Sequence, residues 1–525
     1  MVEHDTLVVS RVRAARILDG PWDAIVIGAG IGGLTAAALL AKLGGLRVVV
    51  LERHYQPGGL AQAFKRRGHV FDVGVHYVGD CGAERAPMRR LFDVLTDRRL
   101  AWSRLLDPYD RFRLADGEVG AGTGIEALRA AFAGYAPREG DAIDRYLAEL
   151  RACAREAPGF LLTRAAGLDV SRAPFYRWAD VTTSDFLDRL GLSPRLAALV
   201  TAHFGNYGVV PSRSSFAAHA SATAHYLAGA YYPVGGGGRI ARELARALVA
   251  RGGAVVVRAE AERVLLENER VAGVRLEDGR EVRAPLVVSD IGAALTYGRL
   301  LGPDDPHAGA LAEAARRIGP SASHAALYVG LDRPARALGL TGQNLWITPE
   351  ATHDVSAWLE GRTREPPGLF VSCPSANDPS AAGRPGSVVA SILLPYAAFA
   401  RWEASRAHRR SADYDALKER LTRETLALLL RHVPELAGAV VHAEMSTPLS
   451  TRHYAGHPHG ETCGLDHTPA RFRSAPVAAS PITGLYLTGQ DAWLCGVGGA
   501  AFGALASASA ILKRNLLAEL VLGHR

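Results

Sequence analysis

Two apolar segments near the start of the chain enclose a stretch of small residues. Residues 24–27 read "AIVI" and residues 46–52 read "LRVVVLE", and such nearly continuous apolar runs are typical of strands buried on both faces of a parallel sheet. The stretch between them contains Leu34, Ala38 and Ala41 and predicts a helix with a small apolar face. The order strand, helix, strand therefore predicts a βαβ unit.

Two later segments continue the same kind of pattern. In the middle of the chain we expect a helix over Ile240–Ala250, a short buried strand at Val255–Val257, and alternating strands around the turns "ENER" and "EDG". Towards the other end, Gly484–Thr488 predicts a strand that leads into a glycine-rich helix. We therefore expect strands from three distant segments of the chain to belong to one domain.

The first predicted turn carries residues that suit a dinucleotide. Gly28, Gly30 and Gly33 fit G-x-G-x-x-G between a strand and a helix, where the glycines permit the turn, the approach of a pyrophosphate and close packing of the helix. Glu52 ends the next strand, nineteen residues after Gly33, where a carboxylate accepts hydrogen bonds from a ribose diol. This spacing favours FAD or NAD over NADP, the alternative being a βαβ unit without a nucleotide.

The residues after Glu52 favour FAD. A glycine pair, Gly58-Gly59, is followed by a basic, hairpin-like stretch and by "FDVGVHYVG". This resembles the extended N-terminal FAD signature of the amine oxidase and phytoene desaturase superfamily. The resemblance implies further cofactor contacts, which we expect at Ile31, Arg53, Leu60, Ala61, Val264, Gly489, Asp491 and Gly498.

A second glycine-rich segment, "YYPVGGGGRIARELARAL" at 231–248, raises the question of a second nucleotide site. A site for NADPH needs an apolar strand before the glycines, and "PVGGGG" lacks one. We therefore interpret Gly235–Gly238 as the turn by which the chain re-enters the first domain.

These patterns together predict an α/β fold, with a Rossmann-like FAD-binding domain of the glutathione reductase and amine oxidase type interrupted by an α+β substrate domain. The FAD-binding domain is expected to comprise residues 20–100, 229–310 and 476–525. The substrate domain is expected at 101–228 and 311–475, after an N-terminal extension, 1–19. The stretches "RLAALVTAHFGNYG" and "FAAHASATAHYLAGAYY" are expected to line an apolar channel in the substrate domain.

Composition excludes several classes of protein. The chain has 525 residues, 48% hydrophobic, with a net charge of +7, and only four of its basic residues are Lys. We ascribe this Arg bias to a GC-rich, bacterial genome, and the basic residues form no stripe with aromatic residues, so nucleic-acid binding is not expected. The charge is compatible with weak attraction to an anionic membrane.

Cellular location is also predicted from the sequence. The five Cys form no C-x-x-C pair and indicate a reducing compartment. The N-terminal residues lack the apolar core of a signal peptide, and no apolar run is long enough to span a bilayer. We expect a cytoplasmic protein, with at most peripheral contact with the inner face of the membrane.

Four segments extend the family resemblance over the chain from about residue 22. They are "FDVGVHYVGD", "GAYYPVGGGGRIARELARAL", "STPLSTRHYAGHPHGETCGLDH" and "GLYLTGQDAWLCGVGGAAFGAL", and they are similar to the branch of phytoene desaturase-type flavoproteins that contains carotenoid isomerases and retinol saturases. The resemblance implies FAD and an apolar conjugated polyene or isoprenoid substrate. It leaves desaturation, cis-trans isomerisation and saturation open, and also the electron donor or acceptor. Trp493 and Cys495 depart from the residues more usual in close relatives.

Three residues are candidates for catalysis or substrate contact. His76 lies on a strand expected to pass the flavin, where it donates a proton, orients substrate or serves only a structural purpose. Tyr77 and Trp493 are expected to flank a polyene, unless they are core residues. Cys495 raises the further hypothesis of a thioether to the flavin.

Other chemistries are less well supported. His453, His457, His459 and His467 suggest a metal site, but their spacing places no clean set on one helix face and Pro458 interrupts any helix, so we expect no metal and a loop over the flavin pocket. The main alternative is a flavin amine or amino-acid oxidase, for which no aromatic cage or carboxylate clamp is recognisable. A flavin-binding protein without catalysis is a third interpretation.

Overall fold

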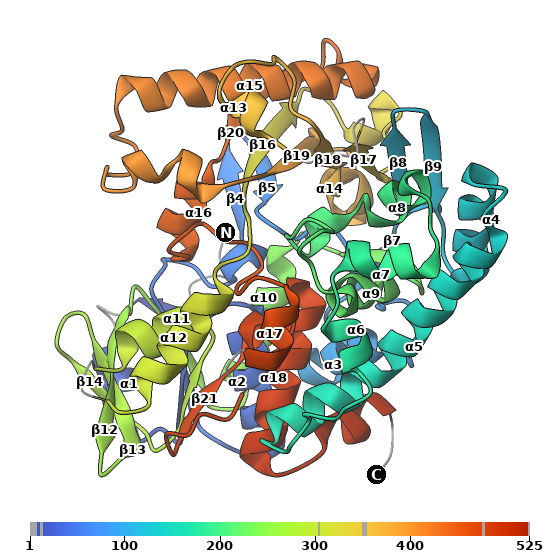
Figure 1. Cartoon of the computed structure of the whole chain (residues 1–525). Helices are drawn as coiled ribbons and strands as arrows, with labels where there is room; N and C mark the ends of the chain where they lie inside the picture. Colours follow the sequence, from blue (N-terminus) through green and yellow to red (C-terminus); the bar gives the residue numbers. More distant parts are fainter. Residues whose placement is uncertain (1–7, 11–13, 303–304, 349–353, 475–477, 523–525) are drawn as a thin grey trace.

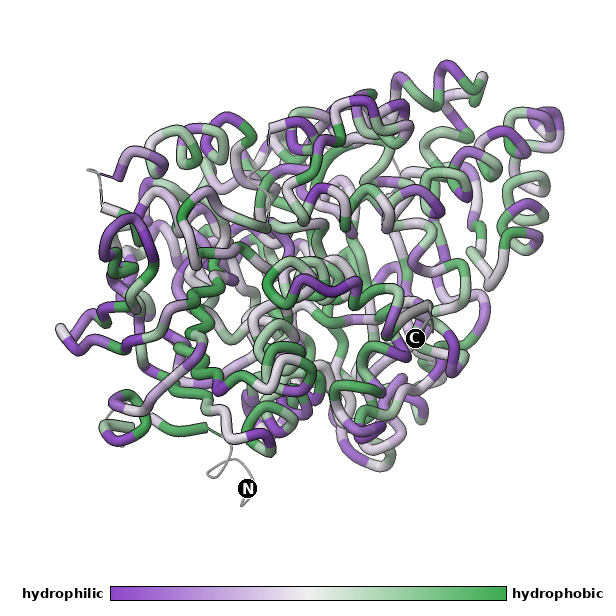
Figure 2. The backbone as a smooth tube through the Cα atoms, turned by 90° about the horizontal axis from the view of Figure 1, so that it is seen from below, coloured by the Kyte–Doolittle hydropathy of each residue, from purple (hydrophilic) through white to green (hydrophobic). Residues whose placement is uncertain are grey.

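The fold was analysed in a computed structural model, which describes residues 8–10, 14–302, 305–348, 354–474 and 478–522 (Figure 1). Hydrophobic segments run through the middle of the molecule, and many of the hydrophilic ones lie at its edge (Figure 2). None of the helices described is both long and apolar enough to cross a bilayer.

A six-stranded parallel sheet forms the first layer. Its strand order is β1-β11-β3-β2-β15-β21. Residues 24–27 are all buried, as the apolar run predicts. The strands are β1 (Val9–Ser10), β2 (Ala24–Ile27), β3 (Val48–Glu52), β11 (Ala254–Val257), β15 (Val287–Ser289) and β21 (Leu485–Leu487). Segments far apart in sequence therefore build one sheet, and the expected N-terminal extension contributes its edge strand.

Both faces of this sheet are covered. Side chains that alternate along the strands pack on one face against α2 (Ile31–Gly44), α10 (Gly238–Val249) and α18 (Gly496–Leu512). On the other face they pack against the antiparallel sheet β12 (Ala261–Glu267), β13 (Arg270–Leu276) and β14 (Glu281–Arg283), and against α1 (Ala15–Leu18), α11 (Ala293–Leu295) and α12 (Ala308–Ile318). This explains why the strands have no polar face.

A seven-stranded mixed sheet forms the second layer, in the order β20-β16-β19-β18-β17-β8-β9. Only the β17–β8 pair is parallel. The strands are β8 (Asp110–Leu114), β9 (Gly117–Ala121), β16 (Ser323–Leu331), β17 (Asn344–Thr348), β18 (Leu369–Ser372), β19 (Ser387–Leu394) and β20 (Val440–Met445). α15 (Ala412–His432) crosses the top of the view and packs on the outer face (Figure 1). Short helices α13 (Ser356–Leu359) and α14 (Pro374–Asn377) lie in its connections.

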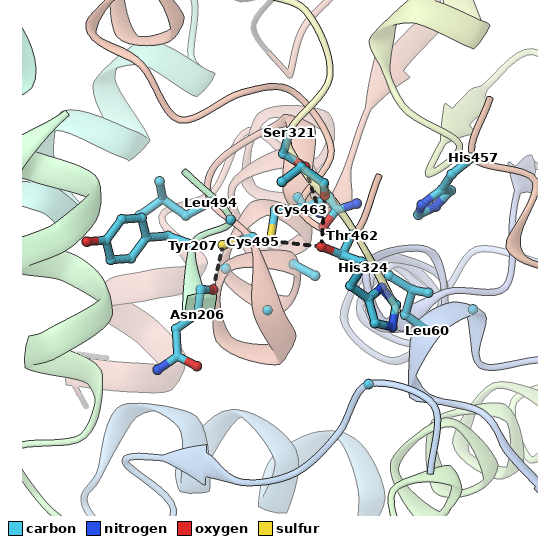
Figure 3. A pocket seen from close by; sticks show the side chains of 18 of the residues that line it. Leu60, Asn206, Tyr207, Ser321, His324, His457, Thr462, Cys463, Leu494 and Cys495 are labelled. Carbon is cyan, nitrogen blue, oxygen red and sulfur yellow. Dashed lines mark hydrogen bonds between the residues drawn. The ribbon is translucent and has the colours of Figure 1, made fainter. Parts of the chain in front are cut away.

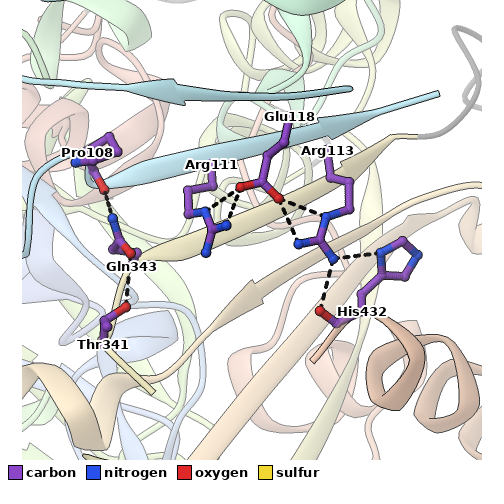
Figure 4. A network of polar contacts seen from close by, with 7 residues as sticks. All are labelled: Pro108, Arg111, Arg113, Glu118, Thr341, Gln343 and His432. Atoms are coloured by element: carbon purple, nitrogen blue, oxygen red, sulfur yellow. Dashed lines mark hydrogen bonds and ion pairs between the residues drawn. The ribbon is translucent and has the colours of Figure 1, made fainter. Parts of the chain in front are cut away.

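Polar contacts tie the edge of this sheet to its surroundings (Figure 4). Glu118 on β9 accepts hydrogen bonds from Arg111 at 2.6 Å and from Arg113 at 2.7 Å, both on β8. Arg113 also donates to the His432 carbonyl at the end of α15, at 3.0 Å. Because these groups are partly exposed, their ion pairs contribute little to the stability of the protein, and their main effect is to fix the relative positions of β8, β9 and α15.

Helices cover the remaining side of the second layer. α5 (Gly140–Ala165) is the longest and packs against α9 (Phe216–His225) in a separate apolar core. The other helices of this part are α4 (Ile125–Tyr135), α6 (Tyr176–Ala179), α7 (Thr183–Leu190) and α8 (Pro194–Thr201). Elsewhere the chain forms α3 (Pro87–Thr96), α16 (Pro448–Ala455) and α17 (Pro469–Ser474).

Two small sheets join the layers and explain the second glycine-rich segment. β4 (Ala63–Arg66) and β5 (His69–Asp72) form the expected hairpin, and β10 (Ala230–Pro233) lies between β6 (Val78–Gly79) and β7 (Trp102–Arg104). A strand thus does precede the glycines, contrary to expectation, but it is antiparallel to its neighbours and outside the six-stranded sheet. Gly237 donates to Asp72 at 3.0 Å, and a Cβ on Gly237 would approach the Val75 Cβ to 2.9 Å. The segment is therefore a packed turn before α10.

Candidate active site

One large cavity, of about 1590 Å³, extends between the two layers. Typical ligand sites enclose roughly 300–1,000 Å³, so this cavity exceeds the needs of one small molecule. Its wall includes the glycine-rich turn after β2, the inner face of the second sheet, α5, α9 and the start of α18. The cavity therefore connects a nucleotide-type loop to an apolar interior.

Backbone geometry at one end of the cavity suits a dinucleotide. Gly28 and Gly58 have φ of +96° and +126°, values that favour glycine. A Cβ on Gly59 would lie 3.2 Å from the Gly30 Cα, so the second glycine pair packs directly on the first loop. The N-terminus of α2 begins at Ile31 in the cavity wall, and free amides at such a position favour phosphate.

Glu52 is held at this end by two backbone hydrogen bonds. Its carboxylate accepts from the Ala29 amide at 2.8 Å and from the His54 amide at 2.7 Å. Burial raises the pKa of Glu52, and these two bonds oppose the rise. The side chain therefore braces the glycine turn as well as facing the cavity.

Most of the expected cofactor residues line the cavity. They are Gly28, Gly30, Ile31, Glu52, Arg53, Gly58, Gly59, Leu60, Ala61 and Gly498, together with the three catalytic candidates, His76, Tyr77 and Trp493. Gly33 lies behind the wall, where a Cβ would collide with the Gly28 carbonyl, in agreement with its expected packing function. Both channel stretches also contribute to the wall, at residues 202–208 and 218–226.

Three expected cofactor contacts are displaced from the wall. Val264, where we expected an adenine contact, is buried in the core of the neighbouring sheet, and residues 259–261 form the wall instead. Gly489 packs against Gly32 behind the turn. The Asp491 carboxylate accepts from the Ala293 amide at 2.9 Å and the Leu465 amide at 2.8 Å, which makes it a link between loops.

Asp290 is a residue of this end that the sequence analysis missed. It follows β15, and a Cβ on Gly30 would lie 2.6 Å from its carboxyl. Burial raises the pKa of Asp290 to about 8. The carboxyl is therefore mostly neutral at pH 7, so it does not repel an anion bound at the turn.

His76 is neutral and oriented. Its Nδ1 is hydrogen-bonded to the Ser372 hydroxyl, at the end of β18, over 2.8 Å, and its ring packs edge-on against Phe370. Burial lowers the pKa of His76 to about 4. His324 on β16 also lines the cavity, its buried Nδ1 has no hydrogen-bond partner among the described residues, and burial lowers its pKa to about 4. Two uncharged imidazoles therefore face the same space.

Tyr77 is the cavity end of a buried polar chain. Its hydroxyl donates to the Asp110 carboxyl at 3.2 Å and accepts from the Asn206 amide at 2.9 Å. Asn344 donates to the other oxygen of Asp110 at 2.9 Å, because the two residues are register partners on the parallel strands β17 and β8. Burial raises the pKa of Asp110 to about 7. The chain therefore holds a proton close to the cavity near neutral pH.

The histidine-rich segment, which is the end of α16 and the loop after it, borders the cavity. Residues 454–459, 462–463 and 466–467 are in the wall, and Figure 3 shows His457, Thr462 and Cys463 among them. Trp493 packs against Phe160 and Phe175. These two phenylalanines are buried in the apolar core, and Trp493 is only partly buried. Across the described ranges, no group of three or more His, Cys, Asp or Glu side chains is placed to hold a metal ion.

Comparison with known families and solved structures identifies the class. A model of the NAD(P)-binding Rossmann-like domain matches residues 26–95. The fold is similar to that of putrescine oxidase, with a TM-score of 0.62 and 17% identity over 94% of this chain and 99% of that one. Cyclohexylamine oxidase from Brevibacterium oxydans gives a TM-score of 0.60 and 18% identity, over 94% and 99% of the two chains. The fold class is thus confirmed as a mixed α/β fold with a Rossmann-like domain, shared with these two oxidases.

Sequence comparison identifies the family. All-trans-retinol 13,14-reductase of Danio rerio is 35% identical, over 95% of this chain and 87% of its own length. The human all-trans-retinol 13,14-reductase is 32% identical, over 98% and 89%. Prolycopene isomerase 1 of an Oncidium hybrid cultivar is 26% identical, over 90% and 80%. The chain is an enzyme that belongs to the retinol reductase family, within the phytoene desaturase-like FAD oxidoreductase superfamily, and the resemblance seen in the sequence is confirmed.

Proposed function

We propose that this enzyme binds FAD and adds two hydrogens across a C=C bond of an apolar conjugated polyene of retinoid type. The observation that carries the proposal is the single cavity that joins the glycine turn to an apolar interior. It is supported by the 35% identity to a retinol 13,14-reductase over almost the whole chain. Reduced FAD supplies a hydride, and this chain supplies orientation, a dry site and a proton.

The glycine turn fits the dinucleotide. In this proposal Glu52 binds the ribose diol and the amides at the start of α2 bind the pyrophosphate. A Cβ on Gly30 would lie 2.6 Å from the Asp290 carboxyl and a Cβ on Gly59 would lie 3.2 Å from the Gly30 Cα, which explains why both positions are bare. The start of α18 also lines the cavity, and its positive end favours negative charge on a bound ring.

An apolar wall provides the polyene site. Beyond the dinucleotide end, the cavity is bordered by Ala157, Leu161, Val209, Ala222, Trp346, Ile347, Leu369, Phe370, Ile392 and Leu394. Burial of such a surface against a hydrocarbon contributes about 25 cal/mol per Å². Because such substrates partition into membranes, we also propose that the enzyme is cytoplasmic and contacts the membrane peripherally.

Tyr77 and Asp110 are proposed to supply the proton. Hydride addition to one carbon of the double bond leaves a carbanionic partner carbon that must be protonated. The Tyr77 hydroxyl lies in the wall and Asp110, with a pKa of about 7, replaces the proton that it gives up. His76, neutral above about pH 4, is proposed to orient the substrate through its fixed ring.

The two alternative activities are less well supported. Isomerisation is favoured by the prolycopene isomerases, but at 26% identity. Amine oxidation is suggested only by fold likeness at 17–18% identity. The stacked rings of Tyr77 and Tyr226 lie 4.4 Å apart and contact each other, so no amine fits between them as in an aromatic cage.

Anaerobic spectroscopy and product analysis test the proposal. FAD-loaded enzyme is reduced with dithionite and incubated with all-trans-retinol, and the product is separated and its absorption recorded. A product with a shorter conjugated system, formed as the flavin reoxidises, is expected. A product with altered double-bond geometry and unchanged flavin would indicate an isomerase, and bleaching of oxidised enzyme by an amine would indicate an oxidase; either would overturn the proposal.

A further inference from the structure

Two cysteines from different loops meet in the cavity wall. Cys463 lies between α16 and α17, and Cys495 directly precedes α18. Both sulfurs contact the same turn of the chain: the Cys495 thiol donates to the Asn206 carbonyl at 3.4 Å, and a Cβ on Gly208 would lie 3.1 Å from the Cys463 sulfur. Each thiol also perturbs the pKa of the other, and Figure 3 draws the two side chains next to each other in the cavity wall.

The loops that carry the two cysteines are locked together. The buried Arg471 guanidinium donates to the Leu465 carbonyl of one loop and to the Gln490 and Trp493 carbonyls of the other, the last two at 2.6 and 3.0 Å. The Cys495 amide is hydrogen-bonded to His467 at 3.3 Å. Because buried charge-assisted bonds hold both loops, the thiols are preorganised.

The surroundings favour a thiolate at this pair. Cys495 is the N-cap of α18, a helix of 17 residues, and positive charge on Arg471 acts on both sulfurs. The mutual influence of the two thiols lowers the pKa of Cys463 and raises that of Cys495. Cys463 is thus the nucleophilic member. Cys81, Cys153 and Cys373 are buried and outside the cavity wall.

The pair also lies on the cofactor side of the cavity. The loop that ends at Cys495 begins at Gly489, which packs against Gly32 in the dinucleotide turn. Gly496–Gly499 continue the same wall at the start of α18. The pair therefore lies next to a loop that packs on the proposed dinucleotide turn.

We propose that Cys463 and Cys495 form a redox-active pair that receives electrons from a small dithiol and passes them to the bound flavin, an inference that rests on the proposed FAD. Closure of the Cys463–Cys495 disulfide releases two electrons and two protons, which reduce the flavin. A dithiol entering the cavity then attacks the disulfide, leaves as its own cyclic disulfide, and restores both protein thiols. The pair thereby supplies the reductant that saturation of a double bond consumes.

Thiol counting tests the pair without any activity measurement. The protein is treated with the thiol oxidant diamide, denatured and alkylated, and its peptides are analysed by mass spectrometry. We expect the loss of two of the five thiols and a single cross-link between the Cys463 and Cys495 peptides. Retention of all five thiols, or a cross-link elsewhere, would overturn the proposal.

Flavin bleaching tests the electron transfer. Under anaerobic conditions dithiothreitol is expected to bleach the FAD of the unmodified protein and of the control Cys373→Ser, but not of Cys463→Ser or Cys495→Ser. Equal bleaching of all four proteins would refute electron entry through the pair, and so would failure to bleach the unmodified protein. Dithionite-reduced unmodified enzyme with all-trans-retinol bypasses the cysteines, so a failure there concerns the proposed function alone.

Discussion

Replacement of Asp110 by Asn gives the sharpest test of the proton supply. The two side chains are nearly isosteric, and Asn keeps the bond from Asn344 and a polar contact with Tyr77. It cannot ionise. With a pKa of about 7, the wild-type carboxyl is about nine-tenths protonated at pH 6 and about one-tenth at pH 8. The rate of polyene reduction is therefore expected to fall roughly tenfold across this interval in the wild type.

In Asp110→Asn this dependence should disappear, and the rate at pH 6 should fall by about 10²–10⁴-fold, the range for loss of a general acid. The assay is single-turnover reoxidation of dithionite-reduced flavin by all-trans-retinol, followed between pH 5.5 and 8.5. A variant that keeps both the wild-type rate and the wild-type pH profile would refute the assignment of Asp110.

Stability gives an independent check. The folded pKa of about 7 lies above an ordinary value of 3.8, so the folded state retains the proton that the unfolded chain loses. Stability from this group is complete below about pH 4 and is lost as the pH rises through about 7. The difference corresponds to on the order of 4 kcal/mol. Denaturation at pH 4.5 and 7.5 should show a smaller fall for Asp110→Asn than for the wild type.

Three other substitutions separate cofactor, packing and substrate effects. Glu52→Ala should weaken FAD binding to the apoprotein by about 10–100-fold, because a braced carboxylate is lost, whereas exposed Glu267→Ala should not; equal affinities in a fluorescence titration would contradict this. Gly237→Ala should lower the free energy of unfolding by about 1–3 kcal/mol through its contacts with Val75 and Asp72, with FAD content of the folded protein unchanged, while Gly134→Ala, with open space around it, should be neutral or stabilising. If the folded Gly237→Ala variant lost FAD, the interpretation of Gly235–Gly238 as a purely structural turn would be wrong, and this segment would be a candidate nucleotide site. His76→Gln should change KM for retinol and leave the pH profile intact, because His76 stays neutral over the assay range; a shifted profile would make His76 the proton donor.

Local patterns predicted the glycine-rich end of the cavity well. The turn from Gly28 to Gly33, Glu52 and the pair Gly58-Gly59 are close in sequence, and each glycine has a steric reason that a motif encodes. Val264 lies outside the cavity wall, which residues 259–261 form, because a strand pattern does not mark where the chain leaves the cavity. β10 escaped notice because "AYYP" contains a proline and two tyrosines.

The inner part of the site was out of reach of local patterns. Asp110 and Asn344 are neighbours only because β8 and β17 pair in register, and Tyr77 reaches them from another segment. Cys463 and Cys495 meet through two loops that Arg471 connects. Such juxtapositions depend on the packing of the second sheet, on which a single sequence taken by itself carries little information.

The strand order of the first sheet also has a consequence for biosynthesis. β15 is flanked by β2 on one side and by β21 on the other, and α18, which follows β21, closes the cavity. The ribosome synthesises β2 early and β21 and α18 last. The cavity is therefore complete only after residues 485–512 have been made. Binding of the proposed FAD is therefore expected only after synthesis is complete, and until then the apolar faces of this sheet are not fully covered.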